Sequence, residues 1–339
     1  MHRMTEKQDT ITLLAIESSC DDTAAAIIRN GKILANIVSS QEIHKEYGGV
    51  IPELAGRAHQ QNILPVVKKA LEEAGIEAQE LNGIAYTQGP GLMGSLLVGG
   101  HFAKGMCMAL NIPSIGVNHL QAHVAAHYLN ETMPNFPFLC LLVSGGHTQI
   151  IKVNAPLDME IIGSTIDDAA GEAFDKTAKM LGLPYPGGPL IDQYAELGNP
   201  LAYQFPIAKI EGYGYSFSGL KTSLLYFLQK GVKEDPDFIA KNLNDICASM
   251  RYTIVKTLLD KFEKAVKEAG IKEIGIAGGV SANKLLRKEF DKLAAKNAWK
   301  AFIPKFEYCT DNAAMIAVVG HYKYLAGEST PLSALPFAR

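Results

Sequence analysis

The sequence lacks any C-x-x-C pattern, and its five cysteines are scattered over 339 residues. This spacing argues against a disulfide framework and against a zinc knuckle, and it suits a reducing compartment. No apolar run approaches the length of a membrane span. The first nine residues are polar and lack the hydrophobic region of a signal peptide. We therefore expect a cytoplasmic protein that has no contact with a membrane.

A strong surplus of positive charge is also missing, since the net charge is −3. This excludes a global basic footprint for nucleic acid. Residues 251–300 are an exception, with 12 Lys or Arg against 6 Asp or Glu. A solvated helix face explains this surplus better than a local contact with a phosphate backbone, but both readings stay open. With 47% hydrophobic residues, the chain is long and apolar enough for two domains or lobes.

Three histidines stand four residues apart in "NHLQAHVAAH", at His119, His123 and His127. On an α-helix such positions are neighbours on one face, and two neutral imidazoles there can chelate a transition metal. Zincin proteases use such a pair in H-E-x-x-H, where the Glu activates water. Here Leu120 follows His119, so that base is missing. A metal site and an amphipathic helix with polar histidines both remain possible, because a third ligand must come from elsewhere.

A pattern of three strands and a helix occurs twice along the chain. The predicted strands lie at 10–16, 23–28 and 32–39, then at 138–143, 149–153 and 158–163, and the predicted helices lie at 57–74, 95–110 and 169–181. Each first turn, "ESSCDD" or "SGGHT", can direct backbone N–H groups at phosphate. A further strand at 273–277 enters "GGVSAN" and a helix from 284. Two such lobes facing each other form a nucleotide cleft.

This arrangement resembles the actin, Hsp70 and sugar-kinase (ASKHA) superfamily. It implies an α/β, two-lobed fold with a duplicated mixed-sheet core. We expect a first lobe at 10–135, completed by a C-terminal helix at 310–327, and a second lobe at 136–309 that carries the nucleotide-binding motif. "YPGGPLID", at 185–192, reads as a Pro/Gly-rich loop. Asp311 lies at or near the start of the last helix, where simple capping would explain it.

Several longer motifs together resemble the bacterial tRNA N6-adenosine threonylcarbamoyltransferases, the TsaD type once described as O-sialoglycoprotein endopeptidases. These motifs are "GGVIPELAGRAH", "QGPGLMGSLLVG", "NHLQAH", "LLVSGGHTQ", "DDAAGEAFDKTAKMLGLPYPGGP", "SFSGLKT", "AGGVSAN" and "DNAAM". The resemblance covers nearly the whole chain. It implies transfer of a threonylcarbamoyl group from threonylcarbamoyl-AMP to N6 of the adenosine just 3′ of the anticodon, in tRNAs that read codons beginning with A.

The resemblance also implies a metal site with His119, His123 and Asp311 as ligands. Two imidazoles and one carboxylate leave coordination positions open, as in a catalytic site. Iron is the usual metal of the family, and this ligand set also suits zinc. His127 matches no family position, and we interpret it as a surface histidine or as one that supports the metal ligands without binding the ion.

Other residues receive roles by their place in the motifs. Asp21 and Asp22 resemble a pair implicated in activity, because an amine that attacks a carbonyl must lose a proton to a base, although Asp also favours turns. Relatives outside bacteria have a metal-binding Tyr where Leu142 stands, so a fourth protein ligand is in doubt. The residues expected to contact substrate are Leu142, Val143, Ser144, Gly145, Gly146, Asp175, Gly188, Asp192 and Asn283.

The family implies two protein partners, a shorter paralogue of the TsaB type and a small P-loop ATPase of the TsaE type. The apolar helical segment at 57–74 is the candidate docking site for the paralogue, unless it simply packs on its own lobe. Two alternative functions remain from the residues alone, a metal-dependent endopeptidase and a small-molecule kinase of the same superfamily. A non-catalytic paralogue is a poorer fit, because such paralogues lose the HxxxH motif.

Overall fold

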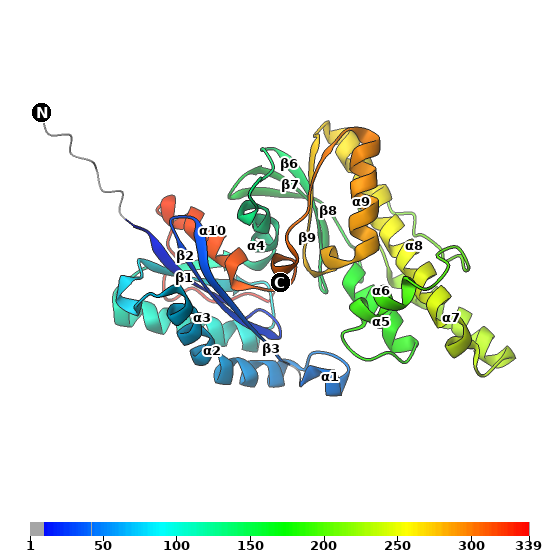
Figure 1. Ribbon diagram of the computed structural model, residues 1–339, viewed down its shortest axis with the longest axis horizontal. Coiled ribbons are helices and arrows are strands. Elements are labelled where there is room, and N and C mark those ends of the chain that lie inside the picture. The colour runs from blue at the N-terminus through cyan, green and yellow to red at the C-terminus, as the bar shows by residue number, and fades with distance from the viewer. Residues whose placement is uncertain (1–9, 42, 339) are drawn as a thin grey trace, which may run out of the picture. The chain divides into compact units, whose positions relative to one another are not determined.

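The computed structural model describes residues 10–41 and 43–338 (Figure 1). The first nine residues, for which the sequence predicts no signal peptide, lie outside the described residues. The chain divides into two compact units. The first contains the described residues up to Gln41, Pro52–Ala125 and the residues from Asp311 on, and the second contains those from 43 to Ile51 and Ala126–Thr310. No helix in the described part of the chain is both long and apolar enough to cross a membrane.

The first unit is built on a five-stranded mixed sheet with the order β3-β2-β1-β4-β5. Its elements are β1 (Thr12–Glu17), β2 (Asp22–Arg29), β3 (Lys32–Ser40), α2 (Pro52–Ala74), the 3₁₀-helix η1 (Ala78–Glu80), β4 (Gly83–Gly89), α3 (Met93–Leu110), β5 (Ser114–Asn118), α4 (His119–Ala125) and α10 (Ala313–Leu325). Strands β1 to β3 are antiparallel, and β1, β4 and β5 are parallel. The turn between β2 and β3 is formed by Asn30 and Gly31 with φ of 49° and 78°, the left-handed conformation that a two-residue hairpin turn demands.

Helices α2 and α3 cover one face of this sheet and α10 packs on the other (Figure 1). Leu14 and Ile16 of β1 join the apolar cluster with α2 and α3, while their neighbours Leu13 and Ala15, also fully buried, point to the opposite face because side chains alternate along a strand. A strand buried on both faces is the arrangement expected of a central parallel strand. The carboxyl ends of β1, β4 and β5 therefore meet at one edge of the sheet.

The second unit repeats this plan, with a sheet of order β8-β7-β6-β9-β10. Its elements are α1 (His44–Tyr47), η2 (Ala126–Leu129), β6 (Phe138–Val143), β7 (Thr148–Ala155), β8 (Asp158–Ser164), α5 (Ala170–Met180), α6 (Gly187–Ala195), α7 (Ser218–Glu234), α8 (Phe238–Ala269), β9 (Glu273–Ala277), η3 (Gly279–Ala282), α9 (Lys284–Asn297), β10 (Lys300–Phe302) and η4 (Phe306–Tyr308). Again the first three strands are antiparallel and the next two are parallel to β6 or to each other. The duplicated mixed-sheet core is thus confirmed.

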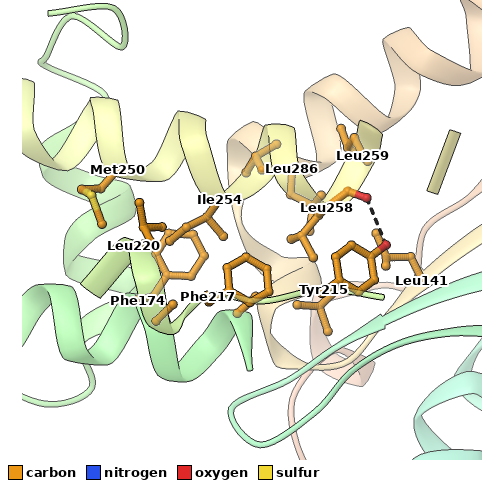
Figure 2. Close-up of a cluster of buried hydrophobic side chains, with 14 of the residues drawn as sticks. Leu141, Phe174, Tyr215, Phe217, Leu220, Met250, Ile254, Leu258, Leu259 and Leu286 are labelled. Atoms are coloured by element: carbon orange, nitrogen blue, oxygen red, sulfur yellow. Dashed lines mark hydrogen bonds between the residues drawn. The ribbon is translucent and has the colours of Figure 1, made fainter. Parts of the chain in front are cut away.

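The long helix α8 supplies much of the core of the second unit. Its residues Met250, Ile254 and Leu258 pack against aromatic side chains that precede α7, among them Phe217 and Tyr215 (Figure 2). The phenol of Tyr215 is buried and donates a hydrogen bond to the carbonyl of Leu258 at 3.1 Å. This bond satisfies a hydroxyl that would otherwise be costly to bury.

Two local expectations from the sequence are wrong. Helix α2 begins at Pro52, five residues before the start expected from periodicity, since proline is well tolerated in the first helical turn. The segment read as a Pro/Gly-rich loop is mostly helix α6. Its first backbone N–H groups, of Gly187 and Gly188, donate to Asp175 Oδ1 of α5 at 2.9 and 3.2 Å. Asp175 thus provides the hydrogen-bond acceptor that the first N–H groups of a helix need. Because Asp175 belongs to a different helix, the composition of the segment itself does not indicate it.

Candidate functional site

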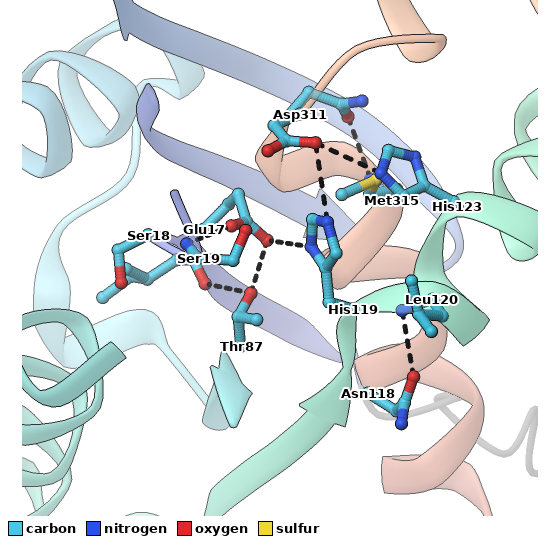
Figure 3. A network of polar contacts seen from close by, with 12 residues as sticks. Glu17, Ser18, Ser19, Thr87, Asn118, His119, Leu120, His123, Asp311 and Met315 are labelled. Atoms are coloured by element: carbon cyan, nitrogen blue, oxygen red, sulfur yellow. Dashed lines mark hydrogen bonds and ion pairs between the residues drawn. The ribbon is translucent and has the colours of Figure 1, made fainter. Parts of the chain in front are cut away.

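The predicted metal ligands come together at one edge of the first unit's sheet (Figure 3). Asp311 Oδ1 lies 3.1 Å from His123 Nε2 and 3.6 Å from His119 Nε2. One ligand atom from each of the three residues lies within 4.8 Å of the others. These separations match three donors around one small cation.

The two histidines are placed by a direct passage from strand to helix. Strand β5 ends at Asn118, and α4 begins with His119. Asn118 Oδ1 accepts hydrogen bonds from the backbone N–H groups of Leu120 at 2.9 Å and Gln121 at 3.1 Å, as a helix cap does. The i, i+4 spacing then puts both imidazoles on the same face of the helix.

Asp311 is not the cap of the last helix. Asn312 holds that position, and its Oδ1 accepts from the backbone N–H of Met315 at 3.1 Å. Simple capping therefore does not account for Asp311, whose side chain is 24% exposed. Its carboxylate is directed at the two histidines instead.

The donor set fits a divalent transition metal. His119 and His123 are 8% and 1% exposed. Both ring nitrogens of His123, including the Nε2 that faces Asp311, are buried with no hydrogen-bond partner among the described residues. Buried imidazole nitrogens normally have partners. Two nitrogen donors and one carboxylate oxygen suit iron or zinc and leave positions for further ligands.

A fourth residue, Glu17, belongs to the same network and was missed from the sequence. It ends β1 with a side chain that is 0% exposed, and its Oε2 lies 3.1 Å from His119 Nδ1. Its place in "IESS" signals a strand end, but nothing local to it shows that a glutamate there is fully buried.

Opposite charges dominate the electrostatics of this network. Burial alone disfavours a charged imidazole, but the carboxylates of Glu17 and Asp311 outweigh it and raise the pKa of His119 to about 9. Burial likewise opposes the charge of Asp311, yet the two histidines bring its pKa down to about 2. His119 also keeps the pKa of Glu17 below its ordinary value. The site therefore favours positive charge between its carboxylates.

Asp21 and Asp22 lie in the first-lobe turn, where Asp22 opens β2. Burial raises the pKa of Asp22 to about 7, although a hydrogen bond with Ser40 acts in the opposite direction. A carboxyl group with such a pKa is suited to accept a proton near neutral pH.

His59, in the "GGVIPELAGRAH" motif, holds this turn in place. Its Nε2 lies 3.0 Å from the carbonyl of Cys20, and its Nδ1 lies 2.8 Å from Thr23 Oγ1. This role of His59 was missed from the sequence, because α2 and the turn are far apart in the chain. The one local indication in the sequence was that His59 follows the glycines and proline at the start of α2 within this motif.

His127 is not a surface histidine, so that part of the prediction is wrong. Helix α4 ends at Ala125, and His127 lies in η2 of the second unit with 0% exposure. Its ring packs edge-on against Phe138, and its Nε2 is 3.9 Å from Cys140 Sγ. Burial lowers its pKa to about 4, so His127 is a neutral core residue.

The predicted substrate turn of the second unit begins where β6 ends. The side chains of Leu142 and Val143 are fully buried, so only the backbone beyond them can meet a ligand. The backbone N–H of Ser144 donates to the carbonyl of His147 at 2.8 Å, which closes the turn. Gly145 and Gly146 are exposed at its tip and carry no side chain to obstruct an approaching phosphate.

The remaining predicted substrate residues also have partners within the protein. Asp192 accepts hydrogen bonds from Arg251 at 2.7 Å and from the backbone N–H of Lys284 at 3.2 Å, and Asn283 caps α9. Asp175 uses only Oδ1 for its two capping bonds. Asp175 and Gly187 also line a groove of about 550 Å³ in the second unit.

The basic stretch at 251–300 lies largely on α8 and α9. Several of its lysines form ion pairs within or between these helices. The pairs are Lys256–Asp260, Lys264–Glu268, Lys267–Glu263, Lys292–Glu289 and Lys296–Glu263. Much of the positive charge is therefore matched locally, which supports the solvated helix face over a phosphate contact.

Comparison with known proteins supplies the family context of this site. The sequence profile of the family described as "TsaD: tRNA N6-adenosine threonylcarbamoyltransferase" matches residues 32–318. A protein of that name from Christiangramia forsetii is 59% identical, with 95% of this chain and 96% of the relative covered. Another, from Porphyromonas gingivalis, is 57% identical, with 98% and 99% covered.

Solved structures at low identity share the fold. HypF from T. kodakarensis has a TM-score of 0.61 at 15% identity, covering 94% of this chain and 48% of that one. The ROK hexokinase from Thermus thermophilus has a TM-score of 0.50 at 15% identity, covering 94% and 100%. The two-lobed fold class expected from the repeated strand pattern is confirmed.

Proposed function

Because the chain belongs to the tRNA N6-adenosine threonylcarbamoyltransferase family, we propose that His119, His123 and Asp311 hold a divalent metal ion at its reacting centre. The protein is an acyltransferase that moves a threonylcarbamoyl group from threonylcarbamoyl-AMP to N6 of the adenosine just 3′ of the tRNA anticodon. The observation that carries the proposal is the convergence of two side chains from α4 with Asp311, which directly precedes the cap residue of α10. Iron is the favoured metal and zinc the alternative.

The metal, when bound, supplies a Lewis acid that polarises the carbonyl of the transferred group. The chain's own residues do the rest. Histidine nitrogens and the Asp311 carboxylate fix the position of the ion at the sheet edge. Asp22 lies in the same unit, and its pKa of about 7 lets it take the proton that the attacking amine must lose. Asp21 stands beside it in the turn and completes the carboxylate pair.

The second unit is proposed to hold the nucleotide part of the donor. The exposed glycines 145 and 146 allow backbone N–H groups to approach the phosphate. Asp175, through its second carboxylate oxygen, and Asp192 are suited to accept hydrogen bonds from ribose hydroxyls. Gly188 lets the backbone approach, and Asn283 lies next to the "GGVSA" turn that faces adenosine in this superfamily.

Reconstitution tests this function directly. The protein is combined with the paralogue, the P-loop ATPase, tRNA and enzymatically made threonylcarbamoyl-AMP, and the nucleosides are analysed by mass spectrometry. We expect threonylcarbamoyladenosine in a tRNA that reads codons beginning with A, and none when guanosine replaces the acceptor adenosine. Absence of the product in the complete mixture, or phosphoryl transfer from ATP to a sugar, or cleavage of a glycoprotein by a protease-free sample, would contradict the proposal.

Protein partners are proposed because this chain alone is a poor match for a polyanion. Its net charge is −3, and much of its basic stretch is already paired. Affinity for nucleic acid depends largely on phosphates neutralised by Lys and Arg. We therefore expect efficient turnover, in the cytoplasm, with a TsaB-type paralogue and a TsaE-type ATPase.

The paralogue is proposed to dock on an apolar groove between α2 and α3. The groove has a volume of about 550 Å³ and is lined by Gln60, Ile63, Gly94, Leu97, Val98, His101 and Phe102. Leu64 lies one helical turn from Gln60 and is 63% exposed. Such an apolar surface is suited to pack against helices of another protein.

A Leu64→Glu variant is expected to weaken the paralogue complex by at least about tenfold, because a charge must be desolvated in the interface. Single-turnover transfer should persist. Met108→Glu is the matched control, since Met108 is 68% exposed on α3 and does not line the groove. Pull-down with the purified paralogue measures the complex. Equal capture of both variants and the wild type would place the docking site elsewhere.

A further inference from the structure

Glu17 is a buried acceptor surrounded by three donors (Figure 3). The backbone N–H of Ser19 donates to its Oε1 at 2.5 Å, and Thr87 Oγ1 lies 2.5 Å from its Oε2. His119 Nδ1 lies 3.1 Å from the same Oε2. Burying a carboxylate is costly unless hydrogen-bond donors such as these satisfy it. A glutamate at this position is therefore expected to have a role that an apolar side chain could not fill.

We propose that Glu17 is a positioning residue, which fixes the tautomer and the ring orientation of His119 so that Nε2 is offered to the metal ion. This inference rests on the proposed metal centre and adds a residue that contacts no metal. An ionised carboxylate only accepts hydrogen bonds. The proton of a neutral His119 must then be on Nδ1, and the lone pair on Nε2 faces Asp311 Oδ1, 3.6 Å away.

The position of Glu17 in the sheet holds its carboxylate rigidly, and so restrains the ring of His119. It lies at the end of β1, which pairs with β2 on one side and with β4, the strand of Thr87, on the other. The hydroxyl of Thr87 and the amide of Ser19 hold the carboxylate against rotation, since each oxygen has its own donor. A metal-binding histidine restrained through its second nitrogen is both oriented and made a better donor.

A Glu17→Gln substitution reverses the hydrogen-bond pattern. The N–H of Ser19 requires an acceptor, so the amide oxygen of the new side chain must face Ser19. Its NH₂ group then faces His119 and requires Nδ1 to be the acceptor, which moves the proton to Nε2. If the amide turns over, its NH₂ group opposes the N–H of Ser19. Either arrangement weakens metal binding, although the size of the side chain is unchanged.

The test compares metal affinity in three purified full-length variants, Glu17→Gln, Thr87→Val and Met108→Glu, by zinc titration against a competing chelator. Loss of such an orienting partner typically costs about 10- to 100-fold in metal affinity. We expect a loss of that size for Glu17→Gln, a smaller loss for Thr87→Val, and none for Met108→Glu. In the zinc-loaded wild type, ¹⁵N NMR should show the proton of His119 on Nδ1.

A second readout separates positioning from general stability. The visible absorption of a cobalt-substituted protein reports the ligand geometry, and it should change in Glu17→Gln even in molecules that retain metal. Unchanged affinity together with an unchanged cobalt spectrum in Glu17→Gln, or a proton on Nε2 in the wild type, overturns the inference. A His119→Ala variant that still binds one zinc overturns the metal centre itself, so the two failures are distinguishable.

Discussion

A His119→Ala/His123→Ala variant is expected to lose its bound metal and nearly all of its threonylcarbamoyl transfer. The loss in rate should reach about 10³-fold or more, because Lewis-acid polarisation is worth several kcal/mol and each 1.36 kcal/mol corresponds to tenfold. Elemental analysis of the purified protein measures the metal, and mass spectrometry of the tRNA nucleosides measures the transfer. Full metal content in the double variant would rule out the assignment.

Stability must be separated from chemistry in this experiment. Removal of His119 leaves the buried Glu17 without its charged partner, and such a change lowers the melting temperature. Asp311→Asn avoids this, because the contact between Glu17 and His119 is kept. We expect Asp311→Asn to lose metal and activity with a smaller change in melting temperature.

His127→Ala serves as the control for deleting a nearby histidine that is not a predicted metal ligand. It should retain metal and transfer, while the cavity left in the second unit's core lowers the free energy of unfolding by about 2–4 kcal/mol. Loss of metal from this variant at full folding would contradict the ligand set.

Asp22→Asn is expected to reduce transfer by about 10²- to 10⁴-fold, the usual contribution of a positioned base. The base must be ionised to act, and burial raises its pKa to about 7. The wild-type single-turnover rate should therefore rise with pH through about 7. The residual rate of Asp22→Asn should lack this rise, and a rise of the same size in the variant would show that another group is the base.

The same pKa predicts an effect on stability in metal-free protein. An Asp whose pKa is raised by folding binds its proton more tightly in the folded state, so stability is lost as pH rises from the unfolded pKa to the folded one. Asp22→Asn, which carries no charge, should then melt at a higher temperature than the wild type at about pH 8, and the difference should shrink towards about pH 5.

Strands and hairpins were the most predictable part of this protein. The hairpin at Asn30 and Gly31 carries its own backbone requirement. The continuous apolar run at 138–143 locates β6, and the predicted β7 lies within two residues of its observed ends. Helix α6 was missed, because Asp175 from another helix provides its capping. Glycine and proline in a sequence indicate local backbone preferences, but they cannot indicate that a carboxylate from another helix will cap the segment.

In the candidate site, too, some residues could be predicted from local spacing and others only from the folded structure. The spacing of His119 and His123 follows from helical geometry and could be read directly. The identity of Asp311 as the third ligand came from the family resemblance, since no spacing connects residues so far apart, and its role stays a prediction. Glu17 was out of reach, because its meaning depends on burial and on the positions of Thr87 and His119 in the folded sheet.

Strand β5 passes into α4 without a single connecting residue, and this has a consequence for handling the enzyme. Helix α4 carries both imidazoles and continues directly from the sheet, so most of the entropy of assembling a chelate is lost during folding rather than during metal uptake. Chelator treatment should then leave a folded apoprotein that regains an ion within the time of mixing. One preparation can be stripped and reloaded in turn with iron, zinc or cobalt, and the rates compared on identical protein reveal which ion the site was built to use.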